Sequence, residues 1–399
     1  MPFMRLGLKS SLAQEVAHMG YREPTPIQEA AIPEVLAGKD VIGCAQTGTG
    51  KTAAFILPTL QLISNERGVK ALIVTPTREL ADQIQEVAVA CAKATRHRVA
   101  ALYGGVSYRP QEEKLRRGVD LVVATPGRLL DMINRRSVDL SRVEILVLDE
   151  ADRMLDMGFW PDVKRIMSNL PQERQTLLFS ATMAPKTLDV ISGALRRPVS
   201  VNIGRSATPV TLIDQSVYPV GSLQKTNLLI ELLKERDMSR VLIFGRTKRR
   251  VDNLVRKLKN QGVEAAPIHS DLSQNQRQRT LAGFKDGRYR VLVATDIVAR
   301  GIDVECVSHV VNFDIPSNPE DYIHRIGRTA RAGEGGTAIS LLSPEESRDL
   351  RDIENLIGQK LRREDLPGFN YTERLVPREA PARAGQQQRY RRSYARSLA

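Results

Sequence analysis

The stretch Ala45-Gln46-Thr47-Gly48-Thr49-Gly50-Lys51-Thr52 specifies the fold of the first half of this chain. It lies between a strand-like run, Asp40 to Cys44, and a helix-like run, Ala53 to Leu60. A glycine-rich turn between a strand and a helix places backbone N–H groups around phosphates. Lys51 would reach the terminal phosphates, and the hydroxyl of Thr52 would bind Mg²⁺. The stretch therefore predicts a nucleoside triphosphate site in an α/β domain.

A second stretch, Asp149-Glu150-Ala151-Asp152, follows the apolar run Ile145 to Leu148. It places carboxylates at the carboxyl end of a buried parallel strand, where one can hold a metal and one can activate water. Each stretch alone has an ordinary explanation, a chance Gly-Lys-Thr or a solvated acidic loop. Their order and spacing together favour the nucleotide site, although Ala45 replaces the first glycine of the general pattern.

The composition is that of a soluble globular protein with room for two domains. The chain has 399 residues, of which 42% are hydrophobic and 26% are charged. No apolar run approaches the roughly 20 residues of a membrane helix, and Met1 to Arg5 lacks the apolar core of a secretory signal. We therefore expect no membrane association and a cytoplasmic location.

Cysteine content and charge narrow the class of protein further. The three cysteines, Cys44, Cys91 and Cys306, are scattered, which predicts buried apolar roles and neither a disulfide framework nor a zinc site. The formal net charge of +13 favours a polyanionic partner, nucleic acid before membrane. Residues 368–399 carry seven arginines and two glutamates, about +5, and have no apolar period. This tail is predicted to be disordered, with Arg and Tyr suited to single-stranded RNA or only to solubility.

Short apolar runs alternate with helix-length segments twice along the chain, which predicts two parallel α/β sheets in tandem. The expected strands are 41–44, 71–75, 99–102, 121–124, 145–148 and 176–179, then 217–220, 241–244, 265–268, 291–294, 310–313 and 337–342. The corresponding domains are 1–205, a linker 206–213, 214–367 and the tail 368–399. Only the first half has a phosphate loop, so we expect the active site between the halves.

Over roughly residues 3 to 365 the motifs resemble those of the DEAD-box RNA helicase family, which implies two tandem RecA-like domains. Gly20-Tyr21-Arg22-Glu23-Pro24-Thr25-Pro26-Ile27-Gln28 resembles the family's adenine-recognising element. The resemblance implies that Gln28 reads the adenine edge and that Phe3 stacks on the ring. A Gln amide both donates and accepts, which suits an adenine edge, whereas Phe3 could equally be a core anchor. Ala45 fits the family's own phosphate loop.

The resemblance also assigns catalytic roles in the first half. Asp149 would hold Mg²⁺ together with Thr52, Lys51 would contact the phosphates, and Glu150 would position and deprotonate the attacking water. Ser180-Ala181-Thr182 resembles the segment that couples hydrolysis to strand separation. Three residues alone carry little weight, and a helix N-cap is their ordinary explanation.

In the second half, His324-Arg325-Ile326-Gly327-Arg328-Thr329-Ala330-Arg331 resembles the family's arginine-finger motif. By that resemblance Arg328 and Arg331 would stabilise charge on the transferring phosphoryl group, and Asp303 would contact the ribose. A solvated helix face is the alternative. Ala330 stands where the family often has glycine. Because the loop and the fingers fall in different halves, catalysis would require the halves to close.

RNA is the expected partner, bound through its backbone and therefore without sequence preference. The residues that resemble the family's RNA contacts are Pro76, Thr77, Arg78, Gly105, Thr125, Pro126, Gly127 and Arg128 in the first half, and Thr247, Gln274, Arg277, Thr295 and Asp296 in the second. Taken singly, several of these are ordinary turn residues. The 2′-hydroxyl that distinguishes RNA from DNA has no independent signature here.

The function that follows is an ATP- and Mg²⁺-dependent RNA helicase that separates short duplexes or remodels RNA–protein complexes, within the family most like the bacterial RhlE-like group. Candidate protein partners are those of ribosome assembly or RNA decay. Two other classes stay open: an RNA clamp that turns ATP over too slowly to act as an enzyme, and a DNA translocase. Lys51, Glu150, Arg328 and Arg331 argue against the clamp, and the acidic box with the Gln28 element argues against the translocase.

Overall fold

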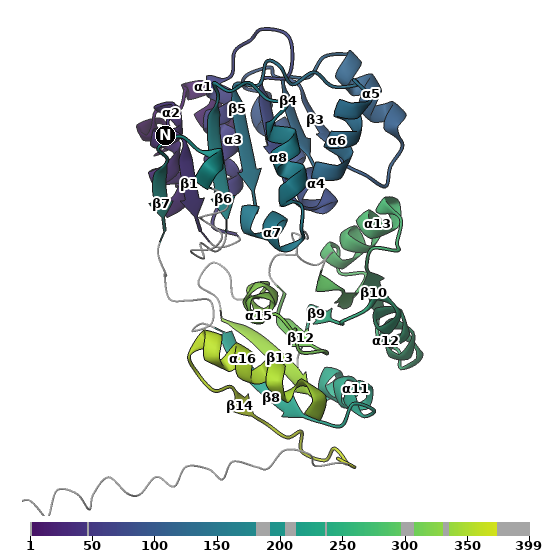
Figure 1. The fold of residues 1–399 in the computed structure, drawn as a ribbon. Helices are drawn as coiled ribbons and strands as arrows, with labels where there is room; N and C mark the ends of the chain where they lie inside the picture. Colours follow the sequence, from purple (N-terminus) through teal and green to yellow (C-terminus); the bar gives the residue numbers. More distant parts are fainter. Residues whose placement is uncertain are drawn as a thin grey trace, which may run out of the picture.

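The structure, a computed structural model, places two α/β bodies one above the other (Figure 1). It describes residues 2–45, 48–180, 192–203, 213–235, 238–296, 307–329 and 335–372. Each body contains one seven-stranded sheet with helices on both faces. This is the tandem RecA-like architecture that the sequence predicts; the first sheet ends at Asn202 and the second begins at Ile213.

The first sheet is parallel in every described pairing and has the order β3-β4-β2-β5-β6-β1-β7. Its strands are β1 (Val41–Cys44), β2 (Ala71–Val74), β3 (Val99–Leu102), β4 (Leu121–Ala124), β5 (Ile145–Asp149), β6 (Gln175–Ser180) and β7 (Val199–Asn202). Nearly all their side chains are buried because helices cover both faces, which explains the continuous apolar runs. The order places β6 between β1 and β5, the two strands that lead into the expected nucleotide site.

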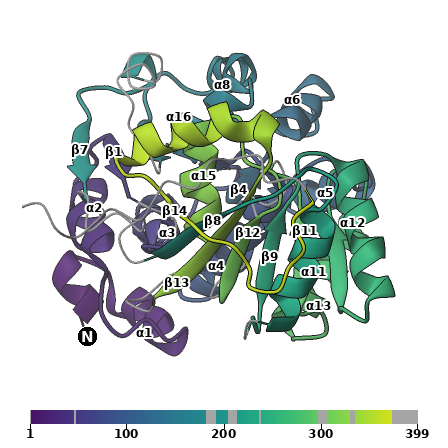
Figure 2. The same ribbon diagram turned by 90° about the horizontal axis from the view of Figure 1, so that it is seen from below.

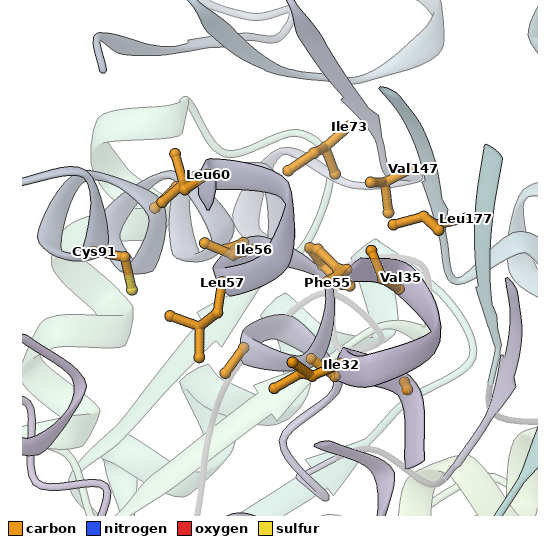
Figure 3. Close-up of a cluster of buried hydrophobic side chains, with 14 of the residues drawn as sticks. Ile32, Val35, Phe55, Ile56, Leu57, Leu60, Ile73, Cys91, Val147 and Leu177 are labelled. Carbon is orange, nitrogen blue, oxygen red and sulfur yellow. The ribbon is translucent and has the colours of Figure 1, made fainter. Parts of the chain in front are cut away.

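Helices on one face pack into the cluster of apolar side chains in Figure 3, which includes Phe55, Leu57 and Val147. They are η1 (Pro2–Leu6), α1 (Ser10–His18), α2 (Pro26–Leu36), α3 (Lys51–Leu62) and α4 (Arg78–Ala92). The opposite face carries α5 (Tyr108–Arg116), α6 (Pro126–Asn134), α7 (Ala151–Asp156) and α8 (Trp160–Met167). Each large apolar side chain contributes about 1.5–3 kcal/mol through burial, so the strand ends are held on a rigid base.

A glycine permits close packing beside the nucleotide loop. The ring of Phe179 in β6 lies against Gly43 in β1, where an added Cβ would be 2.5 Å from a ring carbon. The same ring contacts Phe55 of α3, with the centroids 5.2 Å apart. Gly43 is therefore required by the packing that joins β1, β6 and α3.

The second sheet repeats the first one, with the order β10-β11-β9-β12-β13-β8-β14 and parallel pairing throughout its described strands. Its strands are β8 (Ile213–Pro219), β9 (Val241–Phe244), β10 (Ala265–Ile268), β11 (Val291–Ala294), β12 (His309–Asn312), β13 (Gly336–Leu342) and β14 (Arg362–Arg363). Its helical elements are α11 (Lys225–Glu235), α12 (Lys248–Asn260), α13 (Gln274–Lys285), α15 (Pro319–Ile326), η3 (Pro344–Glu346) and α16 (Ser347–Ile357). Viewed from below, this sheet and α16 lie in front of the first body (Figure 2).

The boundary that we expected between the second domain and the tail requires correction. Phe369 and Tyr371, placed in the tail by the sequence, pack on the second core with their ring centroids 4.8 Å apart. Gln224 also bonds to this segment, through the carbonyl of Asn370 at 2.8 Å and the N–H of Thr372 at 2.9 Å. The burial of these two aromatic side chains holds a segment whose other residues are mostly polar. The second domain therefore extends at least to residue 372. The remainder of the predicted tail, 373–399, lies outside the described residues.

Two other observations concern the compositional predictions. Cys91 is buried as expected, Cys44 is half-exposed, and Cys306 lies outside the described residues. Within the described part of the chain, no helix combines the length and the apolar character needed to cross a membrane.

Candidate nucleotide and RNA site

The phosphate loop begins where β1 ends. The N–H of Ala45 donates to the carbonyl of Ser180 at 3.1 Å, which fixes the start of the loop against β6. Gly48 and Gly50 have φ values of 80° and 92°, a left-handed conformation that favours glycine. Gly50 is the N-cap of α3. Thr49 belongs to the same described turn, whereas Gln46 and Thr47 lie outside the described residues.

Lys51 and Thr52 form the first turn of α3, which begins two residues before the predicted helix-like run Ala53 to Leu60. Lys51 is buried, and its amino group has no hydrogen-bond partner among the described residues. A buried ammonium without a hydrogen bond is costly, whereas an anion at the helix N-terminus would satisfy both the charge and the helix dipole. The geometry therefore fits phosphate oxygens at this position.

The acidic box lies at the end of β5, with Asp149 as its last strand residue. Burial raises the pKa of Asp149 to about 7, and the nearby charge of Lys51 acts in the opposite direction. Glu150 has a φ of 52°, which is strained for a residue with a side chain. This backbone turn directs the chain from the strand into α7. Arg153, one turn along, forms a buried ion pair with Glu150.

Ser180, the first residue of the expected coupling segment, is buried at the end of β6. It pairs in register with Cys44 of β1, while β5 lies on the other side of β6. The segment therefore begins between the phosphate loop and the acidic box. Ala181 and Thr182 lie outside the described residues.

The two adenine candidates both take part in contacts within the first domain. Phe3 is 2% exposed and belongs to the core cluster under α2, which favours the core-anchor alternative over stacking on a base. Gln28 is fully buried and accepts from the N–H of Thr25 at 3.0 Å. Its amide nitrogen donates to the carbonyl of Gly50 at 3.1 Å. Gln28 thus supports the phosphate loop, and its contact with adenine stays a prediction.

Arg78 and Arg128 of the predicted RNA elements come together in the first domain. The guanidinium of Arg78 lies over Gly105, where an added Cβ would be 1.8 Å from a guanidinium nitrogen. Arg128 is buried, donates to the carbonyl of Val106 at 2.8 Å and lies 4.0 Å from the ring centre of Tyr108. Gly105 is therefore needed for the placement of Arg78.

The other predicted residues of these elements are turn and cap residues at strand ends. Thr77 caps α4 by accepting from the N–H of Leu80 at 3.3 Å, with Pro76 buried before it. Thr125 occupies the N-cap position of α6, followed by buried Pro126 and exposed Gly127. In the second domain Thr247 is exposed and caps α12. Thr77 and Thr247 therefore have a structural role whether or not they also contact RNA.

The second-domain candidates are partly engaged within the protein. Asp296 forms a two-point ion pair with Arg325, at 2.6 and 2.7 Å, and Arg325 also donates to the carbonyl of Asp314 at 2.7 Å. Thr295 donates its N–H to the carbonyl of Ile268 at 3.3 Å. No role was predicted for Arg325, although its position beside the predicted fingers could have indicated one. In the structure its guanidinium links Asp296 to the carbonyl of Asp314.

Among the residues that the structure describes, the two domains meet at two places. At the first, Gln274 and Arg277 of α13 are buried, and a guanidinium nitrogen of Arg277 lies 3.0 Å from a carboxylate oxygen of Glu79 in α4. The role of Glu79 was missed, although it stands inside the predicted RNA element.

The second meeting place joins α15 to α7, which face each other across the boundary in Figure 1. Burial and the cation Arg153 of the first domain lower the pKa of His324 to about 4, while Asp152 and Glu150 act in the opposite direction. Arg328 is buried next to this histidine and adds to the lowering. His324 is thus brought to the acidic box, with the predicted finger Arg328 buried beside it. Arg331 and Asp303 lie outside the described residues.

Solved structures share this arrangement. The S. cerevisiae Dbp5 structure bound to RNA and ADP BeF3 has a TM-score of 0.84 and is 33% identical, covering 91% of this chain and 95% of that one. A Dbp5 variant bound to Nup159, a Gle1 variant, IP6 and ADP has a TM-score of 0.61, with 31% identity and coverage of 90% and 96%. The present arrangement of the domains is therefore closer to the RNA-bound form.

Sequence comparisons cover both domains. Residues 25–191 match the family described as DEAD/DEAH box helicase, and residues 224–333 match the helicase conserved C-terminal domain. The ATP-dependent RNA helicase CshA of Limosilactobacillus reuteri is 46% identical over 357 residues, which are 89% of this chain and 72% of that protein. This chain therefore belongs to the DEAD/DEAH box helicase family.

Proposed function

We propose that this chain couples ATP turnover to RNA remodelling through closure of its two domains. The chain is a DEAD-box ATP-dependent RNA helicase and hence an RNA-dependent ATPase. The observation that carries the proposal is that His324 of the second domain is held near the acidic residues Glu150 and Asp152 of the first, with Arg328 buried beside it. A site assembled from two bodies is active only when both are in place.

ATP would bind in the first domain. Lys51, left without a hydrogen-bond partner among the described residues, would contact the terminal phosphates beside the N-terminus of α3. Residues 45–50 would supply backbone N–H groups, and Glu150 would position the attacking water and accept its proton. The ion pair with Arg153 keeps the Glu150 carboxylate in a fixed orientation.

Mg²⁺ fits the residues present. Asp149 is a buried carboxylate whose pKa is raised to about 7 mainly by burial, so a nearby cation would favour its ionised form. Among the described residues no group of three or more metal-ligating side chains gathers, but Mg²⁺ commonly uses one or two carboxylates together with phosphates and water. Asp149 and Thr52 would hold the ion, which supplies neutralisation of phosphate charge when bound.

Arg328 would stabilise negative charge that develops on the transferring phosphoryl group, with Arg331 as the second finger. Because it resides in the second domain, Arg328 reaches the phosphates only in the closed arrangement. This dependence explains how hydrolysis can be tied to RNA, provided that RNA binds across both domains and favours closure.

RNA would lie along the strand ends that carry Arg78, Gly105 and Arg128, and continue to Thr247 and Gln274. Guanidinium groups, hydroxyls and backbone N–H groups at these positions suit phosphate and sugar oxygens, and they provide no base readout. Binding without sequence preference, followed by local separation of a short duplex, is the expected result. Placement in the RhlE-like group, partners in ribosome assembly or RNA decay, and a cytosolic location remain our proposals.

The test is the ATP hydrolysis rate measured without nucleic acid, with single-stranded RNA and with DNA of the same sequence, at one fixed salt concentration. We expect strong stimulation by RNA alone. Equal stimulation by DNA would favour a translocase, and negligible turnover together with ATP-dependent RNA binding would favour a clamp.

A further inference from the structure

A contact between the domains lies outside the nucleotide site, where α4 of the first domain meets α13 of the second (Figure 1). The side-chain amide of Gln278 donates to the carboxylate of Asp82 at 2.9 Å. Neither residue belongs to the motifs that suggested the family. Because Asp82 lies in the first domain and Gln278 in the second, this bond requires the two domains to be together.

The surroundings of the Asp82 carboxylate favour this hydrogen bond. It is half-buried, and burial raises its pKa, whereas the polar side chains of Tyr103, Gln278 and Gln274 act in the opposite direction. Asp82 in turn contributes to the raised pKa of Tyr103, after the larger effect of burial. The carboxylate is thus positioned by its own domain and meets amide groups from the other one.

The arginines around this contact oppose closure of the two domains. Burial and the neighbouring charge of Arg277 lower the pKa of Arg78, and Arg128 adds to the effect. Closure therefore brings Arg277 of the second domain toward two arginines of the first, a repulsion that RNA phosphates would relieve. Glu79 and Asp82, one turn apart on α4, are the acidic groups that meet α13 at this place.

We propose that Asp82 and Gln278 form a latch that stabilises the closed state and thereby sets how much RNA the enzyme needs for full activity. They are positioning residues, since they act through the placement of the second domain. The inference rests on the closure mechanism proposed above. Without the latch more RNA is required, whereas the closed active site itself is unchanged.

The sign of the effect separates this role from simple electrostatics. If Asp82 acted only as a negative charge near the RNA, its removal would strengthen RNA binding. If it acts through the latch, its removal weakens RNA binding, because part of the binding energy must then drive closure. Asp82→Asn separates the cases further, since it removes the charge but keeps an acceptor for Gln278.

The experiment measures the RNA concentration that gives half-maximal ATPase stimulation, at saturating ATP, for Asp82→Ala, Gln278→Ala and the double variant. We expect each single variant to raise this concentration about three- to tenfold, a range suited to one charged hydrogen bond that is partly exposed to solvent. The maximal rate should stay within about twofold. The double variant should be no worse than the more affected single variant, since both remove one interaction.

Matched controls come from the same helices. Glu86→Ala removes an exposed acid one turn beyond Asp82 on α4, and Arg279→Ala removes the neighbour of Gln278; both should leave the half-maximal RNA concentration nearly unchanged. Thermal unfolding of each variant checks that the fold is retained.

An unchanged or lowered half-maximal RNA concentration in Asp82→Ala would overturn the latch, as would additive effects in the double variant. Stronger RNA binding by both Asp82→Ala and Asp82→Asn would assign the residue a purely electrostatic role. Failure of the closure mechanism looks different, because the wild-type enzyme itself would then show no RNA stimulation.

Discussion

The two domains share one sheet order, but the buried lysine that begins the helix after the corresponding strand has different surroundings in each domain. The strand β1 leads through a loop into α3, which begins at Lys51; the corresponding strand β8 leads into α11, which begins at Lys225. Both lysines are buried. The amino group of Lys51 has no hydrogen-bond partner among the described residues, whereas that of Lys225 is 2.5 Å from a carboxylate oxygen of Glu346 and 2.9 Å from the carbonyl of Phe313.

The comparison extends to the acids. Glu150 stands two residues beyond Leu148, the register partner of the last residue of β2, and Asp314 stands two beyond Asn312, the partner of the last residue of β9. Asp314 lies 3.9 Å from Lys225 and 3.0 Å from Arg250, so its charge is used inside the domain.

The hollow beside this cluster, about 290 Å³, contains more acidic than basic side chains: Arg246 and Arg250 against Asp314, Glu345 and Glu346. Both arginines are ion-paired, Arg246 with Glu346 and Arg250 with Asp314, so their charge is already neutralised within the domain. The first domain therefore keeps Lys51 available for a ligand, whereas the second domain neutralises Lys225 with an ion pair of its own.

The largest effect expected is on the chemical step in the first domain. Glu150→Gln should retain ATP and RNA binding while hydrolysis falls by about 10²–10⁴-fold, because only the group that accepts the proton is removed. Asp314→Asn, at the corresponding place in the second domain, should lower stability instead. Measurements of single-turnover hydrolysis and of nucleotide binding distinguish the Glu150→Gln variant from the Asp314→Asn variant. Hydrolysis by Glu150→Gln within a few fold of wild type would remove Glu150 from this role.

The two lysines should differ in the same way. Lys51→Met should reduce hydrolysis by about 10²–10³-fold without loss of stability, because the electrostatic stabilisation of the phosphates is removed. Lys225→Met should destabilise the second domain by about 3–5 kcal/mol, because Glu346 is left buried without its partner. Denaturant unfolding and ATPase assays on both variants provide the measurement. If Lys225→Met instead kept full stability and abolished nucleotide binding, the contrast between the domains would be wrong.

A pH dependence is expected at the boundary between the domains. Burial and Arg153 lower the pKa of His324 to about 4 in the closed form, from an ordinary value of 6.5. Above pH 6.5 the ring is neutral in both forms. As the pH falls from 6.5 toward 4, an open form takes up a proton that the closed form excludes, so closure is weakened, by roughly tenfold at pH 5.5.

The measurement that tests this pH dependence is the RNA affinity in the presence of a non-hydrolysable ATP analogue, from pH 7.5 to 5.5. His324→Gln, which cannot be protonated, should show a flatter profile. Equal slopes for both proteins would show that the weaker binding at low pH has another origin.

The smallest effect concerns the residues after the second domain. Removal of 373–399, which retains the packed residues Phe369 and Tyr371, should weaken RNA affinity modestly. The slope of log affinity against log salt concentration should become shallower by roughly 0.7 for each RNA phosphate that these residues neutralise. The unfolding temperature should not change. An unaltered salt dependence would show that these residues do not bind RNA.

Most of the fold could be predicted from the apolar runs, but three strands at or near the sheet edge were missed or shortened. Strand β7, Val199–Asn202, has exposed residues at two of its four positions, so it lacks a continuous apolar run. Strand β8 begins at Ile213 and not at residue 217, because Asp214 and Gln215 interrupt the run. Strand β14 consists of two arginines, which carry no apolar signal.

The candidate site was predicted unevenly for a related reason. Motifs located Lys51, Asp149 and Glu150, because phosphate and metal chemistry allows few residue types at a strand end. They could not show that Phe3 is used by the core or that Asp296 is paired with Arg325, since these depend on contacts between distant segments.

The amino-acid sequence alone was enough to establish two parallel α/β domains, a phosphate loop and an acidic box in the first, and arginines in the second. These follow from local rules, the apolar period of buried strands and the backbone needs of a phosphate loop. The folded structure was needed to show that Lys225 is neutralised internally while Lys51 is not, and that Asp82 meets Gln278. The reason is physical: the role of a buried charge depends on which groups the fold brings within a few ångströms of it.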